Sequence, residues 1–250
     1  MNTVQIGSLR LEISEPEESI ALVRDWPGRS PARPAFFGYL NPHVYNQSVV
    51  DRDVATFMER CEAVCLDGIA VALAGSLLNR VRLPRVVMHH VFDRCVQAGL
   101  LRGRVILLGL TPEDIGPASE SLRRAAPEAD FVACHHGYLS DSDYAAIFRE
   151  HRDADFILTG MGTPRSERVL LLAAEICSHA LCWHVGGGNL RHWAGTKRRA
   201  PLLLSRLGLE WMHRIAYEPE TRTRYTRGIP FFVRQVLADT WQGRRGDNPG

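Results

Sequence analysis

Short apolar segments that alternate with helical segments constrain the fold of this chain more than any other feature. The clearest is Arg104–Leu110 (RVILLGL), and Ala35–Leu40 has the same character. A strand that is apolar along its whole length is buried on both faces, which is typical of a parallel sheet covered by helices on both sides. The sequence therefore predicts an α/β fold, a Rossmann-like and mostly parallel sheet with helices on both faces.

The expected elements can be placed in order along the chain. After a short hairpin at Val4–Ile13, strands are predicted at Ala35–Leu40, Ala63–Leu66, Arg104–Leu110, Phe131–Cys134, Asp155–Thr159 and Ala180–Val185. Helices are predicted at Ser48–Cys61, Ile69–Leu78, Val86–Ala98, Pro112–Ala126, Ser140–His151 and Pro164–Cys177. The interval between Leu66 and Arg104 has room for two helices or for one further strand.

The chain changes character near Gly195. Beyond it the pattern is helical and rich in arginine, with helices expected at Arg198–Leu207, Leu209–Ala216 and Phe231–Trp241. We predict an α/β catalytic body over residues 1–195, a helical, arginine-rich appendage over residues 196–242, and a disordered tail over residues 243–250.

Composition excludes several classes of protein. A net charge of +2 is too small to indicate nucleic-acid binding by itself. The six cysteines contain no Cys-x-x-Cys pair, so neither a disulfide framework nor a zinc motif is expected. No apolar run approaches the roughly 20 residues of a spanning helix, and the N-terminus lacks a signal-peptide pattern. We expect a cytoplasmic protein with buried free thiols.

Ligands of open parallel sheets bind beyond the carboxyl ends of the strands, so the loops after the strands define the candidate site. Asp67 follows a buried strand and precedes a glycine. It can be a turn or capping residue, or a general base held in a cleft, and the local sequence leaves both open.

Two glycine-containing loops favour a phosphorylated ligand at the same edge. Gly109-x-x-Pro and Gly160-x-Gly-x-Pro each place flexible backbone before a helix N-terminus. Neither matches the dinucleotide or Walker fingerprint, and each alone also fits an ordinary tight turn. The pairs His89-His90 and His135-His136 have no metal-ligand spacing, so no metal is expected.

Read together, these loops resemble the WecG/TagA/CpsF family of bacterial glycosyltransferases. The matching segments are Tyr39-Leu40-Asn41-Pro42, Leu66-Asp67-Gly68-Ile69, Ile106-Leu107-Leu108-Gly109, His136-Gly137-Tyr138, Gly162-Thr163-Pro164-Arg165-Ser166-Glu167 and Val185-Gly186-Gly187. The most specific match is a long run that begins at Ala194-Gly195, continues through Arg198-Arg199-Ala200-Pro201 and ends at Glu218-Pro219.

The resemblance implies an inverting transfer of a sugar from a UDP-sugar to a polyprenyl-diphosphate-linked saccharide in cell-surface polysaccharide synthesis. It implies Asp67 as the catalytic base, no cofactor or metal, and contact with the inner face of the plasma membrane. It also places substrate-binding residues at Asn41, Tyr39, Gly68, Gly109, Tyr138, Gly162, Pro164, Ser166, Glu167, Gly187, Arg214, Arg222 and Arg224.

The chain departs from the family pattern at several places that line the expected site, among them Asn189-Leu190-Arg191-His192, which replaces a Phe-Asp-Phe-like segment after the glycines. Tyr39 stands where threonine is usual, His90 where aspartate is usual, and Ser166 where glutamine is usual. These substitutions put the donor sugar in doubt, because they lie where the sugar would be chosen.

Other interpretations of the loops, the arginines and the C-terminal helix also fit the sequence. A non-catalytic nucleotide-sugar-binding subunit of a polysaccharide assembly complex would keep the same loops, and the arginines could form a solvated basic surface. The apolar stripe of Val233, Val236, Leu237 and Trp241 predicts an amphipathic helix that either caps the core or lies on a membrane surface.

Overall fold

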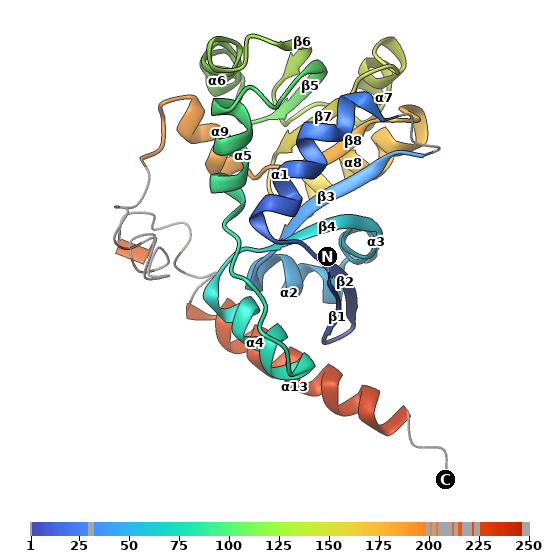
Figure 1. Cartoon of the computed structure of the whole chain (residues 1–250), viewed down its shortest axis with the longest axis vertical. Helices are drawn as coiled ribbons and strands as arrows, with labels where there is room; N and C mark the ends of the chain where they lie inside the picture. The colour runs from blue at the N-terminus through green and yellow to red at the C-terminus, as the bar shows by residue number, and fades with distance from the viewer. Residues whose placement is uncertain are drawn as a thin grey trace.

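The computed structural model describes residues 2–29, 33–198, 201, 204, 212, 215–216, 222 and 226–246. Its centre is an eight-stranded sheet in the order β1-β2-β4-β3-β8-β7-β5-β6 (Figure 1). The strands are β1 (Asn2–Ile6), β2 (Leu9–Ile13), β3 (Ala35–Leu40), β4 (Cys61–Leu66), β5 (Gly103–Gly109), β6 (Ala129–His135), β7 (Phe156–Gly160) and β8 (Leu181–His184). Among the strand pairs of this described sheet, β1–β2 is antiparallel and the others are parallel. The prediction of a mostly parallel α/β sheet is confirmed.

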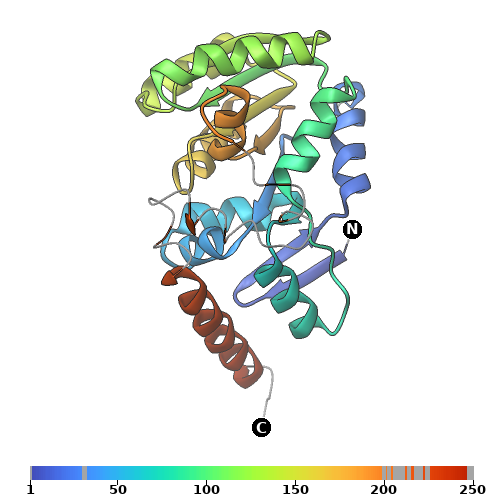
Figure 2. The same ribbon diagram turned by 90° about the vertical axis from the view of Figure 1, so that its left-hand side faces the viewer.

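Helices cover both faces of this sheet, as Figures 1 and 2 show. One face carries α2 (Pro42–Val50), α3 (Arg52–Arg60), α4 (Ile69–Asn79), α7 (Asp141–Glu150), α8 (Arg165–Ile176) and α13 (Gly228–Gly246). The other carries α1 (Pro16–Asp25), α5 (Met88–Gln97), α6 (Pro112–Ala125) and α9 (Gly187–Trp193). A 3₁₀ turn, η1 (Trp26–Gly28), follows α1.

Neighbouring side chains of each parallel strand enter opposite cores. In β3, Phe36 packs in the core with α3, whereas Phe37 stacks on Trp183 in the core with α5. This is why the strands read as continuous apolar runs, because both of their faces are buried.

Most element boundaries agree with the sequence-based ones, and the Leu66–Arg104 interval contains two helices, α4 and α5. The single helix predicted at Ser48–Cys61 is wrong. Asp51 is extended (φ −128°, ψ 113°) and separates α2 from α3, because its side chain accepts from the backbone N–H groups of Asp53 and Val54 at the start of α3. Helix α1 was not predicted.

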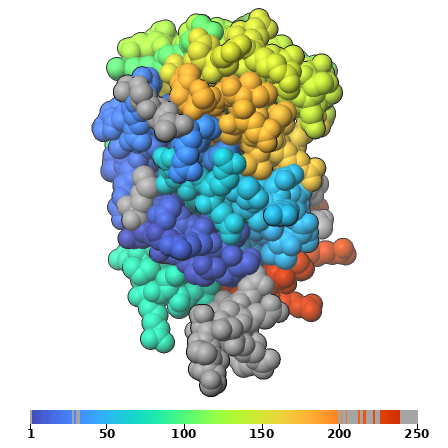
Figure 3. Space-filling view, turned by 90° about the vertical axis from the view of Figure 1, so that its right-hand side faces the viewer, coloured from blue at the N-terminus to red at the C-terminus, as the bar shows by residue number. Residues whose placement is uncertain are grey.

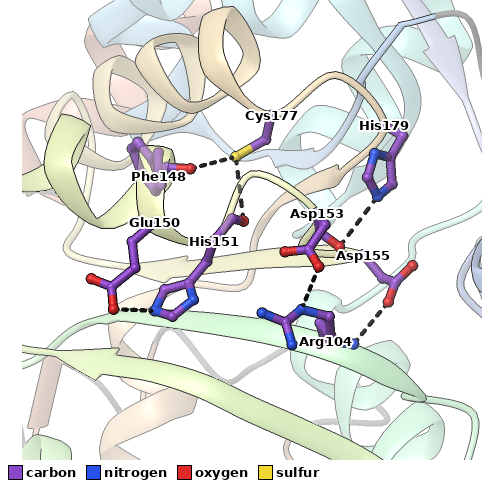
Figure 4. Close-up of polar contacts among 8 residues, drawn as sticks. All are labelled: Arg104, Phe148, Glu150, His151, Asp153, Asp155, Cys177 and His179. Carbon is purple, nitrogen blue, oxygen red and sulfur yellow. Dashed lines mark hydrogen bonds and ion pairs between the residues drawn. The ribbon is translucent and has the colours of Figure 1, made fainter.

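Charged residues at the amino edge of the sheet hold strands together. Asp155 accepts a hydrogen bond from the Arg104 N–H at 2.8 Å, and the Arg104 guanidinium pairs with Asp153 at 3.1 Å (Figure 4). The His179 Nε2 lies 3.3 Å from the Asp153 carbonyl oxygen. The Cys177 thiol lies 3.7 Å from the Phe148 carbonyl oxygen. These groups bond to one another at the edge opposite the candidate site, so their role is structural.

The C-terminal region is described mainly through α13. Phe232 and Val236 are buried, Phe232 packs edge-on against Tyr45, and Asn46 donates to the Gly228 carbonyl at 2.8 Å. The inner side of this amphipathic helix therefore caps the core beside α2. The helices expected at Arg198–Leu207 and Leu209–Ala216 fall mostly outside the described residues, and the proposed domain boundaries stay a prediction.

Candidate functional site

Asp67 and Asn41 come together at the carboxyl ends of two paired strands. Leu40 of β3 pairs with Leu66 of β4, so the residues that follow them emerge side by side. The Asp67 N–H donates to the Leu40 carbonyl at 2.8 Å, which fixes the Asp67 backbone against the end of β3. Asp67 is partly exposed. A carboxylate held by its backbone at an open strand end can reach a ligand, which a buried one cannot.

The Asn41 side chain has a structural task. Its Oδ1 accepts from the Val44 N–H at 2.9 Å and caps helix α2. With Oδ1 in the cap, the amide Nδ2 is the group of Asn41 that can donate to a substrate. Capping and substrate contact are compatible in one residue, and its predicted substrate role stays a prediction.

Gly68 gives the Asp67 loop its shape. It has φ +130°, a conformation that side chains rarely adopt, and a Cβ built on it would meet no atom within 4 Å. The glycine is therefore required by the backbone conformation of the loop and not by crowding. The open space around it keeps the surroundings of Asp67 accessible.

Glycines crowd together at the ends of β5 and β7. A Cβ on Gly109 would lie 2.7 Å from the Gly160 carbonyl oxygen, and one on Gly187 would lie 2.8 Å from the same atom. A Cβ on Gly137 would lie 3.3 Å from the Gly109 Cα. Gly137 and Gly160, which were not among the predicted site residues, thus complete a packed group of bare backbone. The close approach of these backbone segments to one another requires glycine at these positions.

Tyr39 reaches from β3 toward the loop after β8. Its ring lies 4.9 Å from the His184 ring, and its hydroxyl oxygen would lie 3.3 Å from a Cβ built on Gly186. The large side chain therefore fills space beside the glycine loop that a threonine would leave open.

Ser166 and Glu167 are fully buried. The Ser166 hydroxyl accepts a hydrogen bond from the Met161 N–H at 3.0 Å. The backbone N–H of Ser166 donates to the Gly162 carbonyl at 2.9 Å. These bonds hold the loop that precedes α8. The predicted substrate contact of Ser166 stays untested, but its hydroxyl already has a partner within its own loop.

Glu167 pairs with a histidine beneath the site. Its Oε1 lies 3.2 Å from the His184 Nδ1 and accepts from the Thr163 hydroxyl at 2.7 Å. Within the described residues, Glu167 Oε2, His184 Nε2 and Thr159 Oγ1 make no hydrogen bond. Thr159 and His184 are register partners on β7 and β8, so the three groups belong to one buried cluster. Nothing in the spacing of the sequence indicated this contact with His184.

Neighbouring groups determine the pKa of the Glu167 carboxyl. Burial acts to raise its pKa, but the charge and hydrogen bond of His184, the Thr163 hydroxyl and a backbone N–H together hold the pKa below its ordinary value of 4.5. Glu167 is thus a carboxylate at neutral pH and can only accept. The His184 Nδ1 must therefore carry the proton that they share.

The structure describes four of the remaining predicted residues, Gly162, Pro164, Tyr138 and Arg222. Gly162 has φ +83°, and Pro164 precedes α8. Tyr138 is exposed, with the Arg165 guanidinium 6.0 Å from its ring. Arg222 is exposed and donates to the Ile215 carbonyl at 2.8 Å, whereas Arg214 and Arg224 lie outside the described residues.

Lys197, the one lysine of the chain, was not predicted as a site residue. Its Nζ would lie 3.2 Å from a Cβ built on Gly188, in the first turn of α9 after β8. A cation beside bare backbone at a strand end is suited to an anionic ligand. The rarity of lysine in the sequence was the only signal that set this residue apart.

Other chemistry finds less support in the described residues. Burial raises the pKa of the Cys65 thiol to about 12, and five of the six cysteines are buried free thiols, which makes them poor nucleophiles. Within the same residues, no group of three or more potential ligands could hold a metal ion.

A pocket of about 340 Å³ lies between α5, α6 and α9, lined in part by Asp93 and Trp193, and none of the predicted site residues lines it.

The fold and site define a Rossmann-like α/β protein with a partly exposed carboxylate, Asp67, and a packed glycine backbone at one edge of its sheet. Residues 4–246 match the Glycosyl transferase WecG/TagA/CpsF family. The chain belongs to this family and is a glycosyltransferase, as its motifs predicted.

Curated relatives agree with this assignment. One from Staphylococcus aureus (strain NCTC 8325 / PS 47) is named N-acetylglucosaminyldiphosphoundecaprenol N-acetyl-beta-D-mannosaminyltransferase; it is 27% identical over 198 residues, 78% of this chain and 77% of the relative. A protein of the same name from strain MRSA252 is 28% identical over the same shares of both chains.

Proposed function

We propose that this glycosyltransferase moves a sugar from a UDP-sugar to a saccharide carried on polyprenyl diphosphate, in cell-surface polysaccharide synthesis. The relatives support the acceptor class, because their name specifies an N-acetylglucosaminyl diphosphoundecaprenol. The observation that carries the proposal is the partly exposed Asp67, fixed through its N–H to the end of β3 and adjacent to Asn41.

The proposed step is a single displacement. Asp67 takes the proton of an acceptor hydroxyl, whose oxygen attacks the anomeric carbon of the donor. The bond from that carbon to the UDP oxygen breaks on the opposite face, and UDP leaves with the electron pair. Attack opposite the leaving group inverts the anomeric centre.

The leaving diphosphate needs positive charge or oriented N–H groups. Lys197, whose Nζ would lie 3.2 Å from a Cβ built on Gly188, is proposed to supply positive charge, and backbone N–H groups of the loops after β5 and β8 are proposed to supply the donors. The arginines of the C-terminal region, including Arg222, are proposed to add positive charge to the acceptor side. No metal or cofactor is needed in this scheme.

The donor sugar is left open between N-acetylmannosamine and another hexose of exopolysaccharide type. Tyr39 and Ser166 replace the residues usual in the family, and Tyr39 occupies space next to the glycine loop. A bulkier side chain at this position favours a donor that is smaller or differently oriented on that side.

The test is UDP release by the full chain with a panel of UDP-sugars and a lipid-linked N-acetylglucosaminyl acceptor. Asp67→Asn should reduce turnover by about 10²–10⁴-fold, the usual contribution of a general base. Asp130→Asn, which changes an exposed aspartate on β6, is the matched control and should be fully active. Tight UDP binding without turnover for any donor would instead identify a non-catalytic subunit.

A further inference from the structure

Helix α4 exposes an apolar stripe that is unusual for a helix on a protein surface. Its sequence, IAVALAGSLLN, contains no charged residue. Ile69, Leu73 and Leu77 are 45%, 56% and 79% exposed, and Val81 just beyond the helix is 41% exposed. Residues four apart lie on one side of a helix, so these side chains form a single strip facing away from the protein.

The opposite side of α4 is firmly packed. Val71, Ala72 and Gly75 are buried, and a Cβ on Gly75 would lie 2.8 Å from Leu83 and 2.9 Å from Ile6. The helix therefore cannot rotate to hide its apolar strip without breaking its contact with the sheet. The exposed side chains are fixed outward by the packing of the fold.

The strip begins at the candidate base. Gly68 is the N-cap of α4, so the helix starts directly after Asp67. At 1.5 Å per residue, Ile69 and Leu77 are about 12 Å apart along the helix axis. An apolar surface thus leads away from Asp67 and ends among basic residues.

Positive charge surrounds the far end of the strip. Between Asp67 and Asp93 the chain has no acidic residue and three arginines, Arg80, Arg82 and Arg85. Arg80 and Arg82 are exposed on either side of Val81. Apolar side chains with flanking arginines match the interface of an anionic bilayer, where the apolar groups enter and the guanidinium groups stay at the phosphates.

The position of α4 in the molecule fits the same contact. Figures 1 and 2 show α4 and α13 at the same end of the molecule, and in Figure 3 the α4 segment protrudes below the β1–β2 hairpin. Helix α13 also exposes apolar side chains there, Phe231, Val233 and Leu237. Within the described residues no helix has both the length and the apolar character needed to cross a bilayer.

We propose that the α4 surface, defined as Ile69, Leu73, Leu77 and Val81 with Arg80 and Arg82, docks on an anionic bilayer and brings the lipid-linked acceptor to Asp67. The inference rests on the proposed function for its acceptor. A second copy of the chain is the less suitable occupant, because a twofold contact through this surface would bring the arginines of both copies together.

The first experiment measures binding of the full chain to vesicles of phosphatidylglycerol and phosphatidylcholine by sedimentation. Leu73→Ser/Leu77→Ser should lower the partition coefficient at least tenfold without changing the unfolding midpoint, because both side chains already face solvent. Val50→Ser is the matched control, since Val50 is 72% exposed but lies at the end of α2, next to the Asp51–Arg168 pair. Equal binding by the leucine variant and the wild type would overturn the proposal.

Charge is tested separately. Arg80→Gln/Arg82→Gln should weaken vesicle binding at least fivefold at low salt and by less at high salt. Arg149→Gln/Arg152→Gln removes the same charge from exposed positions in and just after α7, at the opposite end of the molecule (Figure 1), and should bind like the wild type. If both double variants lose binding equally, the effect is general charge and the α4 assignment is wrong.

Turnover separates this inference from the proposed function. The leucine variant should lose activity on a long-chain acceptor in vesicles but keep it on a short-chain, water-soluble acceptor. Equal loss on both acceptors would mean damage to the site and contradict docking. If the wild type turns over neither acceptor, the proposed function fails while vesicle binding still decides the docking. If light scattering shows that the leucine variant only converts a dimer to a monomer, the surface is an interface between copies.

Discussion

The loops after β3 and β4 lie at the same edge of the sheet as those after β7 and β8, yet the two pairs use polar side chains differently. Asp67 is partly exposed at the carboxyl end of β4, and its N–H donates to the Leu40 carbonyl. Glu167 and His184 are buried and bond to each other. A polar residue near a strand end is thus a candidate for chemistry or for structure, and burial distinguishes the two.

The largest expected change in stability comes from disrupting the buried Glu167–His184 pair. Glu167→Gln removes the charge that pairs with His184 and should lower the free energy of unfolding by roughly 3–5 kcal/mol, the usual cost of removing one partner of a buried pair. Asp67→Asn changes a partly exposed residue and should lower it by less, about 1 kcal/mol, the average for a point substitution. Urea unfolding measures both, and similar losses in the two variants would remove the distinction.

Gly68 and Gly109 test the same contrast between an accessible loop and a packed loop, here in the backbone. Gly109 and Gly68 both have positive φ, but only Gly109 has a backbone atom within reach of a new Cβ, the Gly160 oxygen at 2.7 Å. Gly109→Ala should therefore destabilise the protein by about 1–3 kcal/mol more than Gly68→Ala, through overpacking. Thermal and urea unfolding of the two variants give this difference. Equal losses would show that φ strain alone governs both positions.

Asn41 allows capping to be separated from substrate contact. Asn41→Ala should cost about 1 kcal/mol of stability by removing the cap of α2. Asn41→Ser keeps a capping oxygen but lacks the amide, so it should retain stability and lose turnover. A serine variant with full activity would show that Asn41 is a cap alone.

The smallest expected effect is a shift in acid stability. The folded pKa of Glu167 lies below its ordinary value of 4.5, so the folded state binds that proton less tightly than the unfolded chain. The stabilisation is complete above about pH 4.5 and is lost as the pH falls through the lowered folded value. Unfolding between pH 3 and 6 should therefore depend less steeply on pH in Glu167→Gln than in the wild type. Parallel curves would contradict the pairing.

The sequence predicted the sheet because its strands are buried on both faces and therefore read as uninterrupted apolar runs. It also located Asp67, since a residue directly after such a strand must lie at the carboxyl edge. The break at Asp51 was missed because a capping aspartate inside an amphipathic pattern resembles a solvent-facing helix residue. The Glu167–His184 contact was missed because it joins α8 to β8, and no local periodicity records which side chains meet across elements.

We propose that Asp67, in the loop after β4, performs the chemistry and that the buried Glu167–His184 pair holds the structure. The most direct test compares UDP release by Asp67→Asn and Glu167→Gln with donor and acceptor saturating, at a temperature where both variants are folded. We predict a 10²–10⁴-fold lower turnover for Asp67→Asn and a turnover within about tenfold of wild type for Glu167→Gln. Near-normal turnover in Asp67→Asn together with its loss in Glu167→Gln would contradict these roles for Asp67 and Glu167.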